Sequence, residues 1–290
     1  RHDLNERDSG YEIKENQRIY CGFAKPSGFD HIFDAGQTYF SHCRVIILTA
    51  VFGAQDYILQ PQNLGKLANT RQVCYFALVD TMTLQDLSFQ RKADGTFRYG
   101  IWTLMVVSNK PFLDVRRNVY IPKDIPFRLF PNSEYSIWVD SKLQLDGDPL
   151  SIIHKLLHLE RKQIAIGVHG SRDCVYDELD VIIKGRHYGS LEVEKNRTLK
   201  TVERYQMDNY PKKNGLVDNA LIIRYHSPII KLLSCQVFNE VQLLSNRDQH
   251  HWNYASWRLK TDRIFNFHPR CILKLITNRI GHRVRHGLME

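Results

Sequence analysis

The sequence has no apolar run long enough to cross a membrane. The longest such run, residues 45–54, is interrupted by Thr49 and Gly53. It is far shorter than the roughly 18 residues that a membrane-spanning helix needs. No transmembrane segment is therefore predicted within these 290 residues, which begin at Arg1.

Several enzyme motifs are also missing. The chain has no Gly-x-Ser-x-Gly elbow, no P-loop and no His-Glu-x-x-His motif, and its six cysteines form no Cys-x-x-Cys pair. A structural zinc site is therefore not expected. Cys74 and Cys235 lie inside apolar runs and are predicted to be buried thiols. Cys21 and Cys43 flank a loop-like stretch and could pair in an oxidising compartment.

Positive charge exceeds negative charge, but it is not concentrated. The 40 Lys and Arg against 31 Asp and Glu leave a formal charge of +9. Such an excess favours nucleotide phosphates, acidic polysaccharides, anionic lipids or nucleic acids as partners. No block of five or six like charges and no DNA- or RNA-binding signature occurs, so nucleic acid is not predicted as a partner.

The overall composition is that of an ordinary globular protein, with 43% hydrophobic and 24% charged residues. We expect one domain over residues 21–258, between a polar lead-in at 1–20 and a basic C-terminal extension at 259–290. A chain of this length buries most of its unfolded surface, so neither metals nor disulfides are expected to be needed for stability.

Five short apolar runs, each followed by polar residues, predict a buried sheet. Continuous apolar strands are covered on both faces, which favours an α/β fold with a mostly parallel sheet between helices. The runs are residues 44–52, 74–79, 101–107, 135–139 and 164–168, with a further strand at 220–224. Helices are predicted from Pro149, over 173–184, 198–208 and 228–244, and from Arg247 onward.

Polar residues follow four of these strands. Asp80, Asn109, Asp140 and His169 each come at or just after a strand's carboxyl end. Ligands of open α/β sheets bind at this edge, so the four side chains are predicted to form part of a site.

Asp140 is the strongest candidate among them. Nucleotide-sugar transferases of the GT-A type place an Asp-x-Asp pair at such a strand end, where it holds a divalent ion on the donor diphosphate. Here the second position is Lys142, which could itself neutralise diphosphate charge. The hypothesis is that Asp140 binds Mn²⁺ or Mg²⁺; the alternative is a strand-end Asp that caps a turn.

Other acidic and basic residues have competing interpretations. Asp146-Gly-Asp148 resembles a metal-binding pair, but Asp148 precedes Pro149 and is better explained as a helix N-cap. Asp114, Arg116 and Arg117, together with Lys123, form a compact charged group that could contact a nucleotide sugar or simply lie in solvent.

Downstream residues extend the predicted site. His169 and Arg172 follow the fifth strand and could position a sugar or phosphate, although a lone histidine is more often structural. Asp248 or Glu240 could act as general base for an acceptor hydroxyl. Either could equally hold a helix end in a salt-bridge network.

These segments together resemble the plant glycosyltransferase-like domain family of mucilage-related probable hexosyltransferases and turgor-defect proteins. The resemblance covers residues 21–258. Its most specific part is, in order, Asn109-Lys-Pro, Asp114-Val-Arg-Arg-Asn, Arg128-Leu-Phe-Pro-Asn, Tyr135-Ser-Ile-Trp-Val-Asp-Ser-Lys-Leu-Gln-Leu and Asp148-Pro. The chain departs from the family pattern at Ser141 and at Val119-Tyr120, which implies a divergent member with an altered donor or acceptor or with impaired activity.

The resemblance implies a GT-A-like fold and transfer of a hexose from a nucleotide sugar to a polysaccharide or glycan of the cell wall, such as pectin or mucilage. It also implies a type II membrane protein of the Golgi lumen, whose N-terminal anchor lies outside this chain, and it makes a Cys21–Cys43 disulfide more plausible. Two alternatives stay open. One is a lipid amidase, because a branch of the family has been described as an alkaline ceramidase, and the other is a non-catalytic domain that binds polysaccharide.

Overall fold

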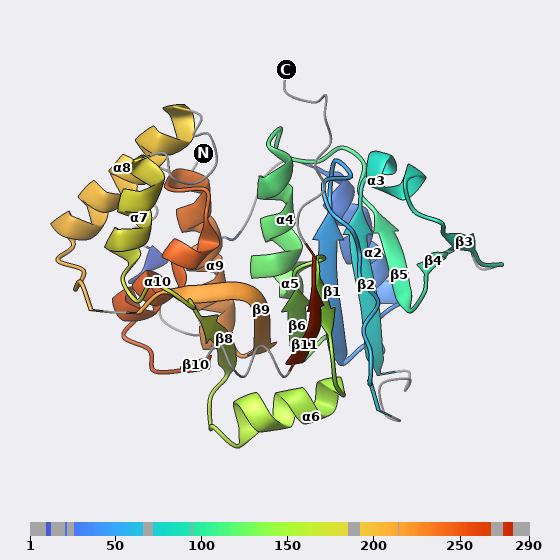
Figure 1. Cartoon of the computed structure of the whole chain (residues 1–290). Coiled ribbons are helices and arrows are strands. Elements are labelled where there is room, and N and C mark those ends of the chain that lie inside the picture. The colour runs from blue at the N-terminus through green and yellow to red at the C-terminus, as the bar shows by residue number, and fades with distance from the viewer. Residues whose placement is uncertain are drawn as a thin grey trace.

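A nine-stranded sheet forms the centre of the computed structural model, which describes residues 10–12, 21, 26–65, 72–93, 95–184, 192–213, 215–267 and 275–280. The strand order is β10-β8-β9-β6-β1-β2-β5-β4-β3 (Figure 1). The strands are β1 (Val45–Val51), β2 (Val73–Val79), β3 (Gln90–Arg91), β4 (Phe97–Tyr99), β5 (Trp102–Val106), β6 (Tyr135–Val139), β8 (Ile164–Val168), β9 (Val217–Tyr225) and β10 (Ile264–Phe267). A separate antiparallel pair joins β7 (Leu143–Leu145) to β11 (Ile276–Arg279).

Most of the central strands run in one direction. β1 is parallel to β2 and β6, β2 is parallel to β5, and β10 is parallel to β8. β9 is antiparallel to both of its neighbours, β6 and β8, so β8 and β10 point the same way as β6. The predicted α/β class with a mostly parallel sheet between helices is confirmed.

β1, at the centre of the sheet, is buried along its whole length because helices cover both faces of the sheet. On one face, Ile46 and Leu48 belong to the same core as Ile121 of α4. On the other face, Ile47 packs in a core with Ile152 of α6. This alternation follows from the two-residue period of a strand, which sends successive side chains to opposite faces.

The predicted helices are present, with sharper boundaries. Among the described residues they are α6 (Pro149–Ile153) continuing as the π-turn η2 (His154–His158), α7 (Val175–Ile183), α8 (Glu192–Met207), α9 (Pro228–Leu243), the 3₁₀ turn η3 (Asp248–His250) and α10 (Trp252–Arg258). Four helices that the sequence analysis did not predict precede them: α2 (Gly28–Thr38), α3 (Thr81–Gln85), α4 (Val115–Asp124) and α5 (Pro126–Leu129). Asp148 caps α6 by accepting a hydrogen bond from the Ser151 backbone N–H at 3.0 Å, so its interpretation as an N-cap is confirmed. In Figure 1, α7 and α8 stand beyond α9, at the side of the sheet where β8 and β10 lie.

The cysteine predictions are wrong. Cys43 bonds to Cys74, and Cys21 bonds to Cys235 across 214 residues of chain. Cys43 precedes β1 and Cys74 lies near the start of the neighbouring strand, so the parallel pairing brings their Cα atoms within 5.7 Å. Proximity across strands therefore decided the pairing, which spacing along the sequence could not show. Cys174 is a buried free thiol.

No helix in the described part of the chain combines the length and the apolar character that a membrane crossing requires.

Candidate functional site

The parallel strands bring the predicted strand-end residues to one edge of the sheet. β2, β5, β6 and β8 point the same way, so Asp80, Asn109, Asp140 and His169 all follow the carboxyl ends of their strands. The side chains nevertheless have different surroundings, which separate structural positions from those open to a ligand.

Asp140 lies at the end of β6 and is held by two neighbours. Its Oδ1 accepts a hydrogen bond of 2.8 Å from the Trp138 indole N–H, and the Lys123 Nζ lies 3.8 Å from the same oxygen. The Asp140 side chain is 26% exposed, whereas that of Lys123 is almost completely buried. Asp140 is therefore partly open to solvent at the carboxyl edge of the sheet, and its contacts with Trp138 and Lys123 fix the orientation of its carboxylate.

Lys123 connects Asp140 to a second carboxylate. Its Nζ lies 3.1 Å from Oδ2 of Asp248, which is buried in η3. The Lys123 ammonium also lies 5.9 Å from the centre of the Trp138 ring, a distance typical of a cation–π contact. The structure thus joins two residues predicted separately, Asp140 and Asp248, through Lys123, which the sequence analysis had grouped with Arg116 and Arg117.

A buried arginine fixes the helix end that carries Lys123. Arg224 of β9 donates to the backbone carbonyls of Asp124 and Lys123 at 2.9 and 2.5 Å. The last carbonyls of a helix lack partners within the helix, and a cation there stabilises them. Arg224 also lies over the Trp252 ring at 5.6 Å. Position 123 is therefore anchored by the sheet, and the lysine side chain extends from an ordered backbone.

The charges in this cluster balance. Burial by itself lowers the pKa of Lys123, but Asp248, Asp140 and Asp124 outweigh it and hold that pKa above its usual range. Burial and the neighbouring Asp248 raise the pKa of Asp124 well above its ordinary value. Burial lowers the pKa of Arg224 to about 10, although Asp124 and Asp248 act against that shift. Lys123 thus faces the carboxylates of Asp140 and Asp248, as burial of charge requires.

Asp80 holds the edge together instead of facing solvent. Its Oδ1 accepts from the backbone N–H and hydroxyl of Thr83, and its Oδ2 accepts from the Gly53 backbone N–H and the Lys110 ammonium. Burial raises the pKa of Asp80, but the hydrogen bonds from Lys110, Thr83 and Gly53 outweigh it and the pKa is lowered. Lys110, in the segment Asn109-Lys110-Pro111, is thereby held at the edge with a quarter of its side chain exposed.

Asn109 stabilises a loop. Its φ of +43° lies in the left-handed region, which asparagine tolerates better than most residues. Its backbone carbonyl accepts from the Gly28 N–H at 3.1 Å, at the start of α2. A Cβ at Gly28 would lie 1.8 Å from the Ser108 carbonyl oxygen, so only glycine allows this approach.

The group Asp114, Arg116 and Arg117 lies at the start of α4, at the opposite end of the helix from Lys123. Asp114 caps the helix by accepting from the Arg116 backbone N–H at 2.9 Å. Burial lowers the pKa of Arg117, and the nearby carboxylates of Asp114 and Glu194 act against that shift. Asp114 and Arg116 are exposed, whereas Arg117 is partly buried.

His169 and Arg172 organise a loop after β8. The His169 Nδ1 accepts from the Arg172 backbone N–H at 3.0 Å. The Arg172 guanidinium donates to Oε2 of the buried Glu178 at 2.5 Å, and Arg247 donates to Oε1 of the same residue at 3.1 Å. Since Arg247 directly precedes Asp248, this ion-pair group adjoins the Lys123 cluster.

Two further predicted residues, Glu240 and Lys142, lie in different parts of the fold. Glu240 is buried in α9 and accepts a 2.8 Å hydrogen bond from the Tyr11 hydroxyl, between α9 and the N-terminal segment. Lys142 follows β6 and is partly exposed, and its carbonyl accepts from the Ile280 N–H. Of these two, only Lys142 lies at the carboxyl edge.

Among the strand-end and cluster carboxylates Asp80, Asp140 and Asp248, Asp140 is the best placed to bind a divalent cation. Asp248, the other carboxylate of the cluster, is buried against Lys123. Mg²⁺ commonly uses one or two protein carboxylates and completes its ligands with substrate phosphates and water. Asp140, with its side chain 26% exposed, could supply one such carboxylate.

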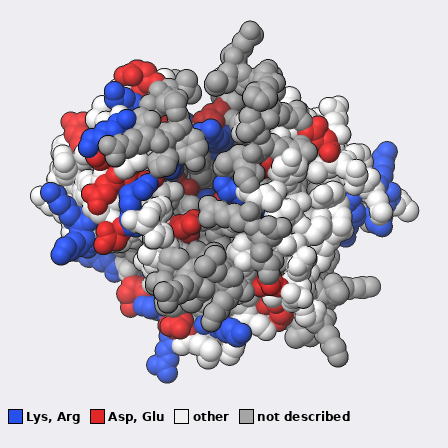
Figure 2. All heavy atoms as spheres, viewed as in Figure 1, with Lys and Arg blue, Asp and Glu red and all other residues white. Residues whose placement is uncertain are grey.

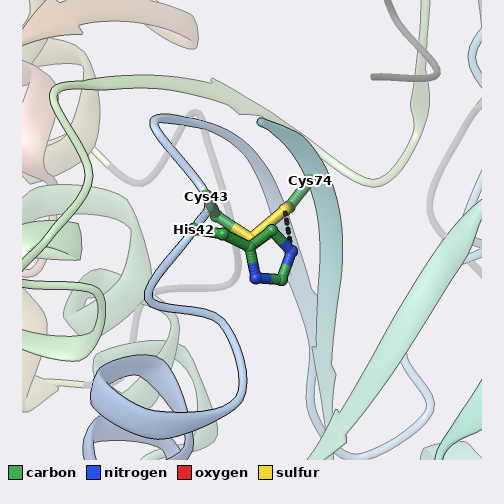
Figure 3. A group of neighbouring side chains, drawn as sticks. All are labelled: His42, Cys43 and Cys74. Carbon is green, nitrogen blue, oxygen red and sulfur yellow. Dashed lines mark hydrogen bonds between the residues drawn. A yellow bond between two sulfur atoms is a disulfide. The ribbon is translucent and has the colours of Figure 1, made fainter. Parts of the chain in front are cut away.

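A different group of potential metal ligands lies at the opposite edge. Among the described residues, His42, Cys43 and Cys74 are the only three such residues whose ligand atoms all lie within 4.8 Å of one another. Figure 3 shows the His42 ring beside the Cys43–Cys74 disulfide, with its Nε2 4.0 Å from the Cys74 sulfur. The disulfide occupies both sulfur atoms, so this group is not assigned as a metal site.

Cavity size does not identify the site. A groove of about 710 Å³ runs beside α10 and β10, at the far side of the sheet from β2. A smaller cavity of about 140 Å³ lies near the carboxyl ends of β1 and β2, lined by Ala54, Tyr57 and Thr83. Neither cavity includes Asp140, so the candidate site rests on the strand-end geometry and the buried charges.

Comparison with known proteins identifies the family of the chain. The family model described as "TOD1/MUCI70, glycosyltransferase-like domain" matches residues 1–282. The chain is 34% identical over 259 residues to the probable hexosyltransferase MUCI70 of Arabidopsis thaliana, covering 85% of this chain and 44% of that protein. It is 30% identical over 241 residues to the alkaline ceramidase TOD1 of the same plant, covering 80% and 51%.

The chain thus spans about half the length of the curated relatives that it matches. The apo structure of the bifunctional glycosyltransferase WbbM is also similar, with a TM-score of 0.41 and 8% identity over 87% of this chain and 41% of that one. The sequence matches are extensive enough to decide the relationship: this chain belongs to the TOD1/MUCI70 glycosyltransferase-like domain family.

Proposed function

We propose that the domain transfers a hexose from a nucleotide sugar to a glycan acceptor, with the donor diphosphate bound at Asp140. The observation that carries the proposal is the position of Asp140: it is the partly exposed carboxylate of a buried ionic cluster at the carboxyl end of the central strand β6. The glycosyltransferase-like family and the 34% identity to a probable hexosyltransferase support it.

The chemistry required is stabilisation of a leaving nucleoside diphosphate. Asp140 would hold Mn²⁺ or Mg²⁺, and such an ion, when bound, stabilises negative charge on the diphosphate. Trp138 and Lys123 orient the carboxylate before any donor binds, so little reorganisation is needed. Lys142, two residues later, adds positive charge for the phosphates.

Lys110 is our candidate for a second phosphate or ribose contact. Asp80 and the Phe52 ring, 5.8 Å from the ammonium, hold Lys110 at the edge between β2 and β5. The cavity lined by Tyr57 and Thr83 lies at the same edge, and Thr83 also donates to Asp80. Asp80 then acts as a positioning residue, because all four of its contacts are made within the protein.

Asp248 is better suited to positioning than to acting as general base. A base must reach the acceptor hydroxyl, whereas Asp248 is buried with its Oδ2 3.1 Å from the Lys123 ammonium. We therefore assign Asp248 to fixing Lys123 under Asp140. Glu240, buried against Tyr11, is not included in the reaction we propose.

The cellular setting is part of the proposal. Two disulfides are the pattern of an oxidising compartment, which supports a location in the Golgi lumen behind an N-terminal anchor outside this chain. Cell-wall pectin or mucilage is the acceptor class we propose, because mucilage-related hexosyltransferases share the sequence block around Asp140.

A donor-hydrolysis assay tests the proposal. Purified protein is incubated with a panel of nucleotide sugars, with and without Mn²⁺, and released nucleoside diphosphate is measured. We expect Asp140→Asn to lower the rate about a hundredfold, the scale of losing one transition-state stabiliser. Asp177→Asn, an exposed change on α7, is the matched control and should leave the rate unchanged.

Two results would contradict the proposal. One is donor hydrolysis that is equal in Asp140→Asn and the unsubstituted protein. The other is release of fatty acid from ceramide without any nucleotide, together with no turnover of nucleotide sugars; that result would favour a lipid amidase, the activity named for the relative TOD1.

A further inference from the structure

The groove of about 710 Å³ beside α10 and β10 has the size of a ligand site. It is separated from Asp140 by β8 and β9, since the strand order there is β10-β8-β9-β6. We refer to it as the edge groove, defined by Lys213, Asn253, Trp257, Lys260, Asp262 and Asn266 of its lining.

Trp257 is the one tryptophan with a substantially exposed side chain. It is 38% exposed, whereas Trp102, Trp138 and Trp252 are at most 1% exposed. Its ring is held from behind by Tyr210, with centroids 5.2 Å apart, and by Tyr254 at 6.0 Å. An exposed indole backed by other rings is a rigid apolar platform, which a flat ligand can cover at little entropic cost.

The polar lining suits hydroxyl groups. The side-chain amides of Asn253 and Asn266 line the same groove as Trp257. Each amide offers two donors and one acceptor oxygen, so it can bind the alternating donors and acceptors of a sugar ring. A platform flanked by planar amides therefore favours a carbohydrate over a purely apolar ligand.

The charge of the edge groove is positive. Lys213 and Lys260 are exposed, and neither forms an ion pair within the described part of the chain. Arg258 is already bonded to Asp208 at 2.9 Å, and Asp262 lies 3.8 Å from Lys162. The two lysines are thus the uncompensated charges, and they favour an anionic ligand.

We infer that the edge groove binds an anionic glycan containing uronic acids. The C–H face of a sugar ring packs on the Trp257 indole, and carboxylates of neighbouring units pair with Lys213 and Lys260. A nucleic acid is the less favoured occupant, because only one aromatic platform is present and the acidic Asp262 lines the same groove. Among the described residues on the face drawn in Figure 2, acidic and basic side chains are also interspersed.

The position of the edge groove suits a polymeric acceptor. Lys213 precedes β9, whose first residue Val217 pairs with Val168 at the carboxyl end of β8. Lys260 precedes β10, whose first residue pairs with Ile164 at the amino end of β8. Lys213 therefore leads into the edge of the sheet that carries Asp140, and Lys260 leads into the opposite edge. The inference that this bound glycan is an acceptor rests on the proposed function, whereas its binding does not.

Tryptophan fluorescence tests the binding directly, because three of the four tryptophans are buried and Trp257 alone is open to a ligand. The full chain is titrated with oligogalacturonate, without donor or metal. We expect a saturable change in emission that is absent in Trp257→Phe. The fully methyl-esterified oligomer has the same backbone without charge, and we expect it to bind much more weakly.

Paired lysine variants provide the charge control. Lys213→Ala with Lys260→Ala removes two exposed ionic contacts, and we expect about tenfold weaker binding. Lys155→Ala with Lys200→Ala removes the same charge from exposed positions on η2 and α8 and should leave the affinity unchanged. Equal loss in both pairs would show only a general charge effect and would overturn the edge groove as the site.

The remaining outcomes are decisive in either direction. Tighter binding of single-stranded DNA than of oligogalacturonate, or no saturable signal, would overturn the inference even if donor hydrolysis depends on Asp140. Saturable, lysine-dependent binding of oligogalacturonate in a protein that turns over no nucleotide sugar would sustain the inference while the proposed transferase activity fails.

Discussion

The ammonium of Lys123 lies 3.1 Å from a carboxylate oxygen of Asp248 and 3.8 Å from one of Asp140, although the two acids are 108 positions apart in sequence. Asp248 and Lys123 are buried, and Asp140 reaches the surface. The buried Lys123 and Asp248 therefore fix the position of Asp140, the partly exposed carboxylate at which we propose that the donor binds. Its energetic and functional consequences can be separated by substitution.

Removing the buried ammonium of Lys123 should lower the free energy of unfolding. Lys123→Met keeps most of the side-chain volume but leaves Asp248 buried without its cation, which typically costs about 3–5 kcal/mol. Urea denaturation followed by circular dichroism measures the free energy of unfolding. Lys155→Met, at an exposed position, should change it by less than about 0.5 kcal/mol.

Pairing the substitution with Asp248→Asn checks the cause. If Lys123 and Asp248 stabilise each other, the double variant should be more stable than the sum of the two single losses implies, by about 1–3 kcal/mol. Strict additivity would mean that the 3.1 Å contact contributes no coupling.

Lys110→Ala should weaken donor binding without unfolding the edge. Its ammonium is one of four donors to Asp80, and the Gly53 and Thr83 contacts stay in place. We expect about tenfold weaker binding of a nucleotide sugar, as for loss of one charged contact worth roughly 1.4 kcal/mol. Calorimetric titration gives the affinity, and unchanged affinity would remove Lys110 from the donor site.

His226 should make the protein less stable in mild acid. Burial, together with the nearby Arg224 and Lys231, lowers its pKa to about 3, against 6.5 in the unfolded chain. Between these values the unfolded state binds one more proton, so stability is fully present above pH 6.5 and is lost as the pH falls toward 3. The slope from this one group is about 1.4 kcal/mol per pH unit.

His226→Gln should remove that contribution. Glutamine cannot protonate but can still donate to the Ser133 carbonyl and bond to the Ser136 hydroxyl, the partners of the two ring nitrogens. Unfolding by urea at pH 4.5 and pH 7.5 should therefore show a smaller pH difference in the variant. An identical difference in both proteins would assign the acid sensitivity to other groups.

The two disulfides should differ in what their loss costs. In the chain-entropy model, cross-links that close 214 and 31 residues stabilise by roughly 5 and about 4 kcal/mol, respectively. Replacing Cys21 and Cys235 with serine should thus lower the unfolding free energy more than replacing Cys43 and Cys74. Denaturation of both double-serine variants, with reduced unsubstituted protein for comparison, measures the difference; a larger loss for the Cys43–Cys74 pair would contradict it.

Local sequence patterns were sufficient to predict the central strands and the polar residues at their carboxyl ends. The apolar runs that became β1, β2, β5, β6 and β8 are continuous because both faces of each strand are covered, and continuous burial is visible in sequence. Caps such as Asp148 before Pro149 are equally local, since the hydrogen bond spans three residues. Asp140 could be selected because it directly follows a buried strand.

The partners of these residues were decided only by the tertiary structure. The sequence placed Lys123 in a charged group with Arg116 and Arg117 and did not indicate that its ammonium meets Asp140 and Asp248. Asp80 appeared available for a ligand, yet Gly53, Thr83 and Lys110 use its oxygens. Cys43 pairs with Cys74 because two strands are adjacent and parallel. Periodicity and caps depend on neighbours along the chain, whereas ion pairs and disulfides depend on which distant segments the sheet brings together.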